Sequence, residues 1–265
     1  MVPRCLTIAT SDSGGGAGIQ ADLKTFARLG CHGTSAIVAL TAQSTTEVRS
    51  VHEAPPEFIR DELDVLFGDI GVDAAKTGML FSARVIETVA DFLGGRKVPL
   101  VVDPVMVAAS GAQLLQDDAV SVLVERLFPL ATVVTPNLHE ACALVGLPYS
   151  DEANREHLAE AIHELGPRAV VVTGGHGSEA VDWLFDGEHH VPIEVARYGD
   201  AATHGAGCTH SAALTAFLAR GEPLEDAARG AAHVASEAVR AGLAEIGAGS
   251  GPVDVFGLDA PVRDR

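Results

Sequence analysis

Residues 100–106 read Leu100-Val101-Val102-Asp103-Pro104-Val105-Met106, three consecutive aliphatic residues followed by an aspartate. An aliphatic run without polar alternation is typical of a strand that is covered on both faces, as in a parallel sheet. A carboxylate at the end of such a strand is costly to bury unless it is paired or bound to a cation. This stretch therefore predicts an α/β fold with a polar site at the carboxyl edge of its sheet.

Short apolar runs alternate with longer amphipathic stretches on both sides of this strand. The predicted strands are residues 5–9, 34–40, 72–75, 100–102, 132–134 and 169–172. The predicted helices between them are residues 19–29, 56–67, 82–93, 117–128, 138–145 and 152–165. This order predicts a doubly wound α/β fold, with a mostly parallel central sheet flanked by helices.

The last third of the chain departs from this alternation. Residues 180–185 and 190–195 flank the turn dipeptide Asp186-Gly187, which predicts a small antiparallel hairpin at the sheet edge. Two closing helices are expected at residues 207–218 and 223–243. Because no repeat, low-complexity tract or linker divides the sequence, residues 1–265 are expected to form a single domain.

The composition is globular and strongly acidic. Of 265 residues, 47% are hydrophobic, and 36 acidic residues outnumber 18 basic ones, for a net charge of −18. Such a field repels nucleic-acid backbones and anionic lipid, so neither is an expected partner. The only lysines are Lys24, Lys76 and Lys97, which leaves few side-chain cations for binding phosphate.

The cysteines and the N-terminus indicate the expected compartment. Cys5, Cys31, Cys142 and Cys208 show no C-x-x-C spacing, so neither a disulfide framework nor a zinc site is expected. The first residues lack signal-peptide anatomy, and no apolar run approaches the roughly 20 residues of a membrane span. A cytoplasmic protein is therefore expected.

The first loop is rich in glycine: Thr10-Ser11-Asp12-Ser13-Gly14-Gly15-Gly16-Ala17-Gly18. A dinucleotide-binding G-x-G-x-x-G pattern starting at Gly14 fails at Ile19, and one starting at Gly16 lies inside the helix. A P-loop is excluded because the sequence contains no Gly-Lys pair. The loop is either a tight strand-to-helix turn or a site where Asp12 and free amides hold a polar ligand.

Two further loops carry carboxylates behind strands. Asp103 either caps amides of its own loop or binds a cation. Asn137 and Glu140, in Thr135-Pro136-Asn137-Leu138-His139-Glu140, have the spacing of a capping box. Glu140 is alternatively a second carboxylate near Asp103, and two carboxylates with waters suit Mg²⁺. The spacing alone favours the cap.

The turn Thr173-Gly174-Gly175-His176-Gly177 follows the strand at 169–172. A formal G-x-G-x-x-A match starting at Gly175 is rejected, because a strand rather than a helix is expected after it. What remains is a turn rich in backbone amides that allows close approach of a nucleotide.

Residues 203–211, Thr203-His204-Gly205-Ala206-Gly207-Cys208-Thr209-His210-Ser211, open an alanine-rich helix. Small residues at a helix start leave several backbone amides directed at one point, with the positive end of the helix dipole behind them. This pattern predicts an anion hole that uses no lysine. Cys208 in the first turn is expected to have a depressed thiol pKa, as a thiolate, a proton acceptor or a member of the anion hole. The alternative is an inert buried cysteine.

Three histidines are interpreted as surface residues. His210 is expected on the exposed side of the closing helix, and His189 and His190 on the hairpin. No third ligand is spaced to make the histidine pair a metal site.

Taken in order, these motifs resemble the ribokinase-like superfamily, and within it the hydroxymethylpyrimidine/phosphomethylpyrimidine kinases of thiamin synthesis. The motifs span nearly the whole chain: Ser11-Asp12-Ser13-Gly14-Gly15-Gly16-Ala17-Gly18, Thr41-Ala42-Gln43, Lys76-Thr77-Gly78-Met79-Leu80, Asp103-Pro104-Val105-Met106-Val107, Asn137 with Glu140, Gly174-Gly175-His176, and His204-Gly205-Ala206-Gly207-Cys208-Thr209.

The resemblance implies an ATP- and Mg²⁺-dependent kinase that acts on 4-amino-5-hydroxymethyl-2-methylpyrimidine and then on its monophosphate. It implies pyrimidine-binding positions at Thr10, Asp12, Asp22, Gln43, Met79, Val105 and Val107. It implies nucleotide-binding positions at Asn137, Thr173, Gly175 and His176, and a metal site at Asp103 and Glu140. The amides of Gly205, Ala206 and Gly207 would stabilise the transferred phosphoryl, with Cys208 as the candidate base, and a homodimer is expected.

Several positions depart from the family pattern. The family usually has glycine at Thr10, lysine at Ala109 and Thr173, threonine at Ala206 and an apolar residue at His210. Ala206 and Thr173 resemble the related pyridoxal kinases, whereas Gln43 resembles the pyrimidine kinases. A pyridoxal or pyridoxine kinase and a non-catalytic pyrimidine-binding protein are therefore the alternatives.

Overall fold

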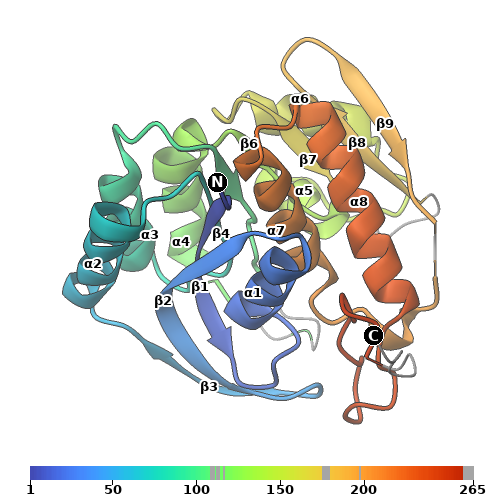
Figure 1. Cartoon of the computed structure of the whole chain (residues 1–265). Helices are drawn as coiled ribbons and strands as arrows, with labels where there is room; N and C mark the ends of the chain where they lie inside the picture. Colours follow the sequence, from blue (N-terminus) through green and yellow to red (C-terminus); the bar gives the residue numbers. More distant parts are fainter. Residues whose placement is uncertain (108–110, 112–113, 116, 175–179, 197, 259–265) are drawn as a thin grey trace.

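The computed structural model describes residues 1–107, 111, 114–115, 117–174, 180–196 and 198–258 (Figure 1). Its centre is a nine-stranded sheet in the order β3-β2-β1-β4-β5-β6-β7-β8-β9. The strands are β1 (Arg4–Asp12), β2 (His32–Gln43), β3 (Val48–Glu53), β4 (Ala74–Thr77), β5 (Leu100–Val102), β6 (Val133–Val134), β7 (Val170–Val172), β8 (Val181–Phe185) and β9 (His190–Glu194). The predicted α/β class is confirmed.

The strands from β2 to β7 pair in parallel, while β3 at one edge and β8 and β9 at the other are antiparallel. The edge hairpin is thus confirmed. Strand β3 was not predicted from the sequence. Its residues, Val-Arg-Ser-Val-His-Glu, are half-buried or exposed, so they carry little apolar signal. Backbone pairing with β2 forms this strand, and no motif marks such pairing.

The helices are α1 (Gly18–Arg28), α2 (Pro56–Val65), α3 (Ala83–Leu93), α4 (Asp117–Val122), α5 (Leu138–Leu144), α6 (Arg155–His163), α7 (Ala206–Ala219) and α8 (Leu224–Arg240). Two predicted helices lose regular α-geometry near their ends. The helix α2 continues as a π-helical turn at Leu66–Ile70, and α4 as one at Leu123–Leu127. None of the helices in the described part of the chain is long and apolar enough to cross a membrane.

Both faces of the sheet are covered, as the aliphatic strands require. Val102 and Val134 pack into a core with residues of α2 to α6. Their neighbours Val101 and Val133 pack instead with residues of α7 and α8. Figure 1 shows α1, α7 and α8 lying together, apart from α2 and α3. The alternation of side chains along each strand therefore divides the apolar core between two helical layers.

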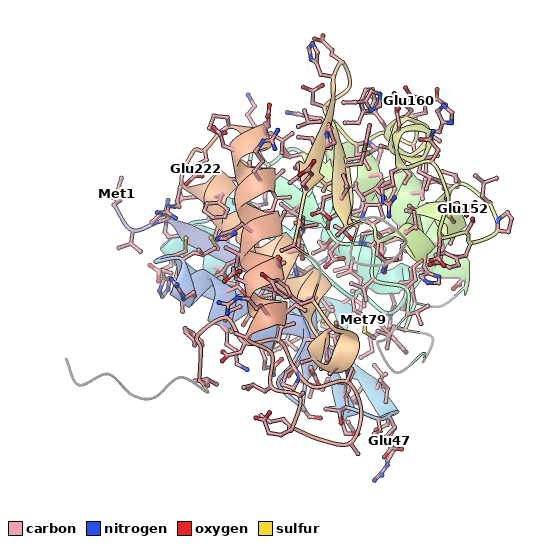
Figure 2. All side chains as sticks on the ribbon, turned by 90° about the vertical axis from the view of Figure 1, so that its right-hand side faces the viewer. Met1, Glu47, Met79, Glu152, Glu160 and Glu222 are labelled. Carbon is pink, nitrogen blue, oxygen red and sulfur yellow. The ribbon has the colours of Figure 1, made fainter. Side chains whose placement is uncertain are left out.

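The winding reverses at β1, which lies between β2 and β4. From β1 the chain builds β2 and β3 on one side, then crosses to β4 and builds outward on the other. The carboxyl ends of strands flanking such a switch point form the crevice where α/β proteins bind ligands. Met79 follows β4 and lies toward the Glu47 end of the molecule in Figure 2, away from Met1.

Candidate active site

The floor of the crevice is formed where β1 and β4 end. Thr10 in β1 is buried, and its Oγ1 donates a hydrogen bond to the carbonyl oxygen of Met79, 3.0 Å away. The hydroxyl is therefore tied to the chain beyond β4, and Met79 itself is only 8% exposed. A side chain at position 10 thus fixes where the segment carrying Met79 runs.

The first loop, residues 12–18, is organised around the carboxylate of Asp12. Its oxygens accept hydrogen bonds from the backbone amides of Gly14 (2.8 Å), Gly16 (3.1 Å) and Ala17 (2.9 Å). The Nζ of Lys24 donates to the carbonyl oxygen of Gly15 (2.8 Å), which fixes the loop from its outer side. The glycine run is therefore a rigid turn that Asp12 holds in place.

Gln43 lies at the end of β2 beside this loop. Its backbone amide donates to Ser13 Oγ (2.8 Å), and that hydroxyl donates to the carbonyl oxygen of Gln43 (2.9 Å). The half-buried Gln43 side chain lines a cavity of about 250 Å³ together with Ser13, Ala42, Ser44, Glu47 and Arg49. The structure thus brings Gln43 against the loop that sequence reasoning paired with it.

A buried ionic cluster lies beneath the crevice. Lys76 Nζ is 2.7 Å from Asp22 Oδ1 and 3.9 Å from Asp103 Oδ2, and the Lys76 and Asp22 side chains are fully buried. Burial is the largest single effect and lowers the pKa of the Lys76 ammonium, but the charge and hydrogen bond of Asp22, together with Cys208 and Asp103, outweigh it, so the net shift is upward. Burial raises the pKa of the Asp22 carboxyl.

Sequence reasoning assigned no role to Lys76. The available signal was a lysine in the middle of the apolar strand segment Ala74-Ala75-Lys76-Thr77, where a charge requires a buried partner. Two of the three lysines of this acidic chain therefore lie near the first loop and the ends of the central strands: Lys76 is in β4, and Lys24 of α1 binds the first loop.

Asp103 and Glu140 are both buried, and the charge of Asp103 acts on Glu140. Asp103 Oδ2 accepts a hydrogen bond from Ser211 Oγ (2.8 Å). Glu140 completes the capping box with Asn137, because its Oε2 accepts the Asn137 amide (3.0 Å) and its own amide donates to Asn137 Oδ1 (3.0 Å). Burial, reinforced by the Asp103 carboxylate, raises the pKa of Glu140 to about 8. The capping interpretation is confirmed, and the influence of Asp103 on the Glu140 pKa is compatible with the prediction that the two carboxylates share a site.

The start of α7 is the predicted anion hole, and the structure changes its membership, because the Ala206 amide donates to the carbonyl oxygen of Thr203 (3.0 Å). Gly205 is the N-cap in a left-handed conformation (φ 87°), and the following amides of Gly207 and Cys208 belong to the first turn, which an α-helix leaves without intrahelical partners. A Cβ at Gly205 would lie 1.8 Å from the carbonyl oxygen of Gly16. Only glycine therefore lets the anion hole pack against the first loop.

The expected depressed pKa of Cys208 is wrong for this structure. Burial raises the pKa of the thiol to about 12, and the positive charge of Lys76 offsets this only in part, because Asp22 and Asp103 act against it. The helix dipole suggested by the sequence is outweighed by desolvation and by two carboxylates contributed by distant segments. Cys208 is thus a protonated thiol at neutral pH.

Two of the predicted nucleotide positions, Asn137 and Thr173, follow β6 and β7. Asn137 and Thr173 form a parallel bridge, and the Thr173 amide donates to the carbonyl oxygen of Pro136 (2.9 Å). Gly175, His176 and Ala109 lie outside the described residues. Two of the four predicted nucleotide positions are therefore brought side by side.

His210 does not lie on the helix surface as predicted. It is buried, with Nε2 3.2 Å from Asp182 Oδ2, and Asp182 Oδ1 accepts the Gly174 amide (2.6 Å). The reason is that α7 packs against the sheet on one side and α1 and α8 on others, so residues 209–216 are all buried.

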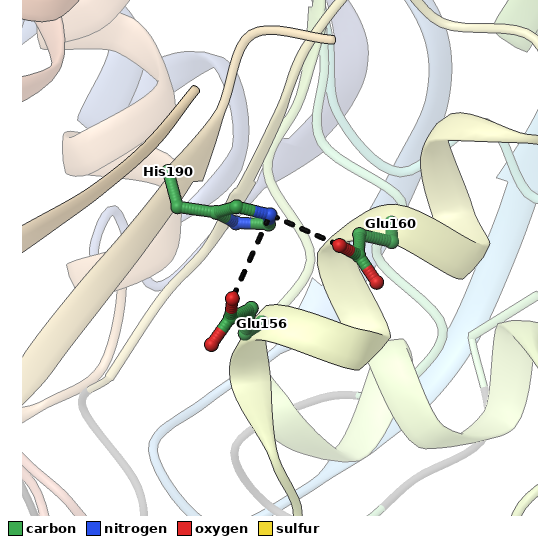
Figure 3. A group of neighbouring side chains, drawn as sticks. All are labelled: Glu156, Glu160 and His190. Atoms are coloured by element: carbon green, nitrogen blue, oxygen red, sulfur yellow. Dashed lines mark hydrogen bonds and ion pairs between the residues drawn. The ribbon is translucent and has the colours of Figure 1, made fainter. Parts of the chain in front are cut away.

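The sequence shows no third ligand spaced to make the His189–His190 pair a metal site, but the fold brings two glutamates of α6 to His190. Glu156 and Glu160 of α6 lie 3.9 Å and 3.1 Å from His190 Nε2 (Figure 3). However, Trp183 Nε1 donates to His190 Nδ1 (2.9 Å), so a neutral ring carries its proton on Nε2, directed at the glutamates. A metal ion would need that nitrogen's lone pair, so the cluster fits a hydrogen-bonded contact between hairpin and helix.

Comparisons with known proteins agree with this geometry. Residues 12–254 match the family model of phosphomethylpyrimidine kinase. The chain is 48% identical over 260 residues to the hydroxymethylpyrimidine/phosphomethylpyrimidine kinase of Rhizobium meliloti, covering 97% of this chain and 98% of that protein. It is 49% identical over 264 residues to the thiamine biosynthesis bifunctional protein ThiED of Geobacter sulfurreducens, covering 98% of this chain and 54% of that longer protein.

A solved structure, the pyridoxal kinase from Staphylococcus aureus in complex with ADP, superimposes with a TM-score of 0.88 at 33% identity, covering 96% of this chain and 94% of that one. This similarity confirms the predicted ribokinase-like architecture at the level of the whole sheet. The family model and the full-length relatives show that the chain belongs to the phosphomethylpyrimidine kinase family.

Proposed function

We propose that the chain transfers the γ-phosphoryl group of ATP to 4-amino-5-hydroxymethyl-2-methylpyrimidine and then to the resulting monophosphate, as a step of thiamin biosynthesis. The observation that carries the proposal is the close backbone approach of Gly205 to Gly16. It places the predicted anion hole at the start of α7 directly against the first loop, at the switch point of the sheet. Full-length similarity to pyrimidine kinases supports the same reaction.

The pyrimidine would lie between the first loop and the end of β2. Gln43 would pair with the ring edge, Met79 and the half-buried Val105 would pack on its faces, and Val107, 47% exposed, would stand at the entrance. Thr10 would set the floor. Because the oxygens of Asp12 and Asp22 already accept internal hydrogen bonds, these carboxylates would shape the pocket through the loop and through Lys76.

The phosphoryl group would be received at the start of α7. Developing negative charge would meet the amides of Gly205, Gly207 and Cys208 and the positive end of the helix, because the Ala206 amide already donates to the Thr203 carbonyl oxygen. Since the Cys208 thiol is protonated at neutral pH, it would act by contact and hydrogen bonding in the anion hole. Phosphoryl transfer through a loose transition state demands positioning more than early removal of the hydroxyl proton.

Asp103 and Glu140 would hold Mg²⁺. The donor set fits, because two buried carboxylates that repel one another are relieved by a divalent cation with oxygen ligands. When bound, the ion supplies charge neutralisation at the phosphates of ATP. The nucleotide would extend over Asn137 and Thr173, which form a bridge, and the ADP complex of the Staphylococcus aureus relative supports nucleotide binding.

A pyridoxal kinase is the second candidate function. The side chain at Thr10 and the residues Ala206 and Thr173 favour it, as does the similarity to the Staphylococcus aureus pyridoxal kinase.

A non-catalytic pyrimidine-binding protein is the third candidate function, motivated by the missing lysines at Ala109 and Thr173. We rank it last because the anion-hole glycines, Asp103 and Glu140 are present.

Steady-state kinetics with the hydroxymethyl pyrimidine, its monophosphate and pyridoxal test the proposal. We expect the highest kcat/KM with the pyrimidines. Higher kcat/KM with pyridoxal would establish the second candidate, and pyrimidine binding without ATP consumption would establish the third.

We also propose a homodimer in a reducing, cytoplasmic compartment. The family resemblance supports the dimer, checked by light scattering, and four free cysteines support the compartment.

A further inference from the structure

Asp12 has its whole carboxylate engaged inside the protein. Oδ1 accepts the Gly14 amide, and Oδ2 accepts the amides of Gly16 and Ala17 and lies 3.0 Å from His204 Nε2. Burial raises the pKa of Asp12, but the hydrogen bonds from His204, Ala17 and Gly14 outweigh it and lower the pKa below its usual value. The carboxylate is therefore ionised, and Nε2 of His204 is the donor.

His204 comes from a segment 192 residues further along the chain. Its imidazole is buried, and its backbone is hydrogen-bonded to the segment at 251–253. The His204 amide donates to the carbonyl oxygen of Gly251 (3.1 Å), and the Val253 amide donates to that of His204 (3.0 Å). The histidine therefore connects three separate parts of the chain at one point.

The contact leaves no space between the two loops. A Cβ at Gly16 would lie 2.2 Å from Cδ2 of His204, and one at Gly205 1.8 Å from the carbonyl oxygen of Gly16. Gly205 is also the N-cap of α7, directly before the amides of the anion hole. Any displacement of His204 from Asp12 therefore moves the anion hole relative to the first loop.

We propose that His204, through its hydrogen bond to Asp12, is a positioning residue for phosphoryl transfer. The pair holds the amides at the start of α7 at a fixed distance from the loop that receives the acceptor substrate. This inference rests on the proposed kinase function of the site. It gives Asp12 a positioning role, because none of its carboxylate oxygens is left without an internal partner.

Kinetics of His204→Ala, His204→Gln and the control His233→Ala, an exposed histidine of α8, test the proposal. We expect His204→Ala to lower kcat by roughly 30-fold or more while the KM for ATP stays within about 3-fold. Glutamine retains an N–H donor, so the kcat of His204→Gln should be at least about threefold higher than that of His204→Ala. His233→Ala should match the wild type.

A double-mutant cycle with Asp12→Asn adds a readout that a purely structural role would not give. Because both substitutions break the same hydrogen bond, the double variant should be no slower than the slower single variant. Full additivity of the two losses in kcat would overturn the proposal. So would variants that lower the thermal midpoint but keep the wild-type kcat once folded.

Alkylation of Cys208 by iodoacetamide in the ligand-free protein, followed by peptide mapping, does not depend on the substrate. Loss of the His204 contact should free the first turn of α7 and speed alkylation by roughly tenfold, with His233→Ala unchanged. An unchanged rate in His204→Ala would contradict the positioning role. If the wild type fails to phosphorylate pyrimidines but the alkylation result holds, the substrate assignment fails and the positioning role stands.

Discussion

Replacing Lys76 by methionine tests whether the Lys76 ammonium stabilises the buried carboxylate of Asp22 near the candidate active site. The variant keeps the length and apolar stem of the side chain and removes the ammonium that lies 2.7 Å from Asp22. Asp22 is fully buried, and its other hydrogen bond comes from Thr7 Oγ1 (2.6 Å). Without the ammonium, the carboxylate must either remain charged in the interior or bind a proton.

The expected loss of stability is large. Removing one partner of a buried ion pair costs about 3–5 kcal/mol, and for a chain of this size each kcal/mol shifts the thermal midpoint by about 2–4 °C. We therefore expect a fall in Tm of roughly 10 °C at neutral pH. Burial already raises the pKa of Asp22, and the loss of Lys76 raises it further.

The stability of Lys76→Met should depend on pH. Between the ordinary pKa of Asp22 and its raised pKa in the folded variant, the folded protein holds a proton that the unfolded chain has released, so its stability falls as pH rises through that range. Thermal unfolding of Lys76→Met should show a deficit that grows from pH 5 to pH 8. The double variant Asp22→Asn/Lys76→Met removes both charges and should recover most of the stability. Lys97→Met, at an exposed lysine, is the control. A single variant as stable as the wild type, or a double variant less stable than the single, would refute the reasoning.

Three further predictions concern single residues. Glu62 accepts the Ile37 amide (3.0 Å), and burial raises its pKa to about 7. The fold therefore loses stability as pH rises from the ordinary Glu pKa of 4.5 to about 7, so Glu62→Gln should stabilise the protein by about 1–2 kcal/mol at pH 8 and little at pH 4.5, measured by urea unfolding. Equal effects at both pH values would contradict this. Cys208→Ala should lower kcat by roughly 100-fold with pyrimidine affinity nearly unchanged, and a wild-type kcat would remove Cys208 from the mechanism. Thr173→Lys should lower the KM for ATP severalfold, whereas no effect would move the phosphates away from Thr173.

Fold class and site location were predictable because each rests on local patterns. The run Leu100-Val101-Val102 predicted a buried parallel strand, and the polar loops after the strands predicted the carboxyl edge as the site. The structure confirms the buried parallel strand, and the site at the carboxyl edge stays a prediction. The hairpin around Asp186-Gly187 followed from turn chemistry alone. Strand β3 was missed because its pairing with β2 leaves no pattern in its own residues.

Residue environments were less predictable, since they depend on segments far apart in the sequence. The pKa of Cys208 is set by burial and by Lys76, Asp22 and Asp103, which lie on other elements. His210 is buried because three elements surround α7, and His190 meets two glutamates of α6. The sequence shows a residue's neighbours along the chain, whereas electrostatics depends on its neighbours in space.

Product analysis is the most direct measurement of whether one site performs both phosphorylations. The protein would be incubated with 4-amino-5-hydroxymethyl-2-methylpyrimidine, ATP and Mg²⁺, and the products followed by mass spectrometry and ³¹P NMR. We predict that the monophosphate appears first and is then converted to the diphosphate, with one ADP released for each phosphoryl group transferred. Recovery of unchanged pyrimidine, alongside phosphorylation of pyridoxal under the same conditions, would contradict the proposed function.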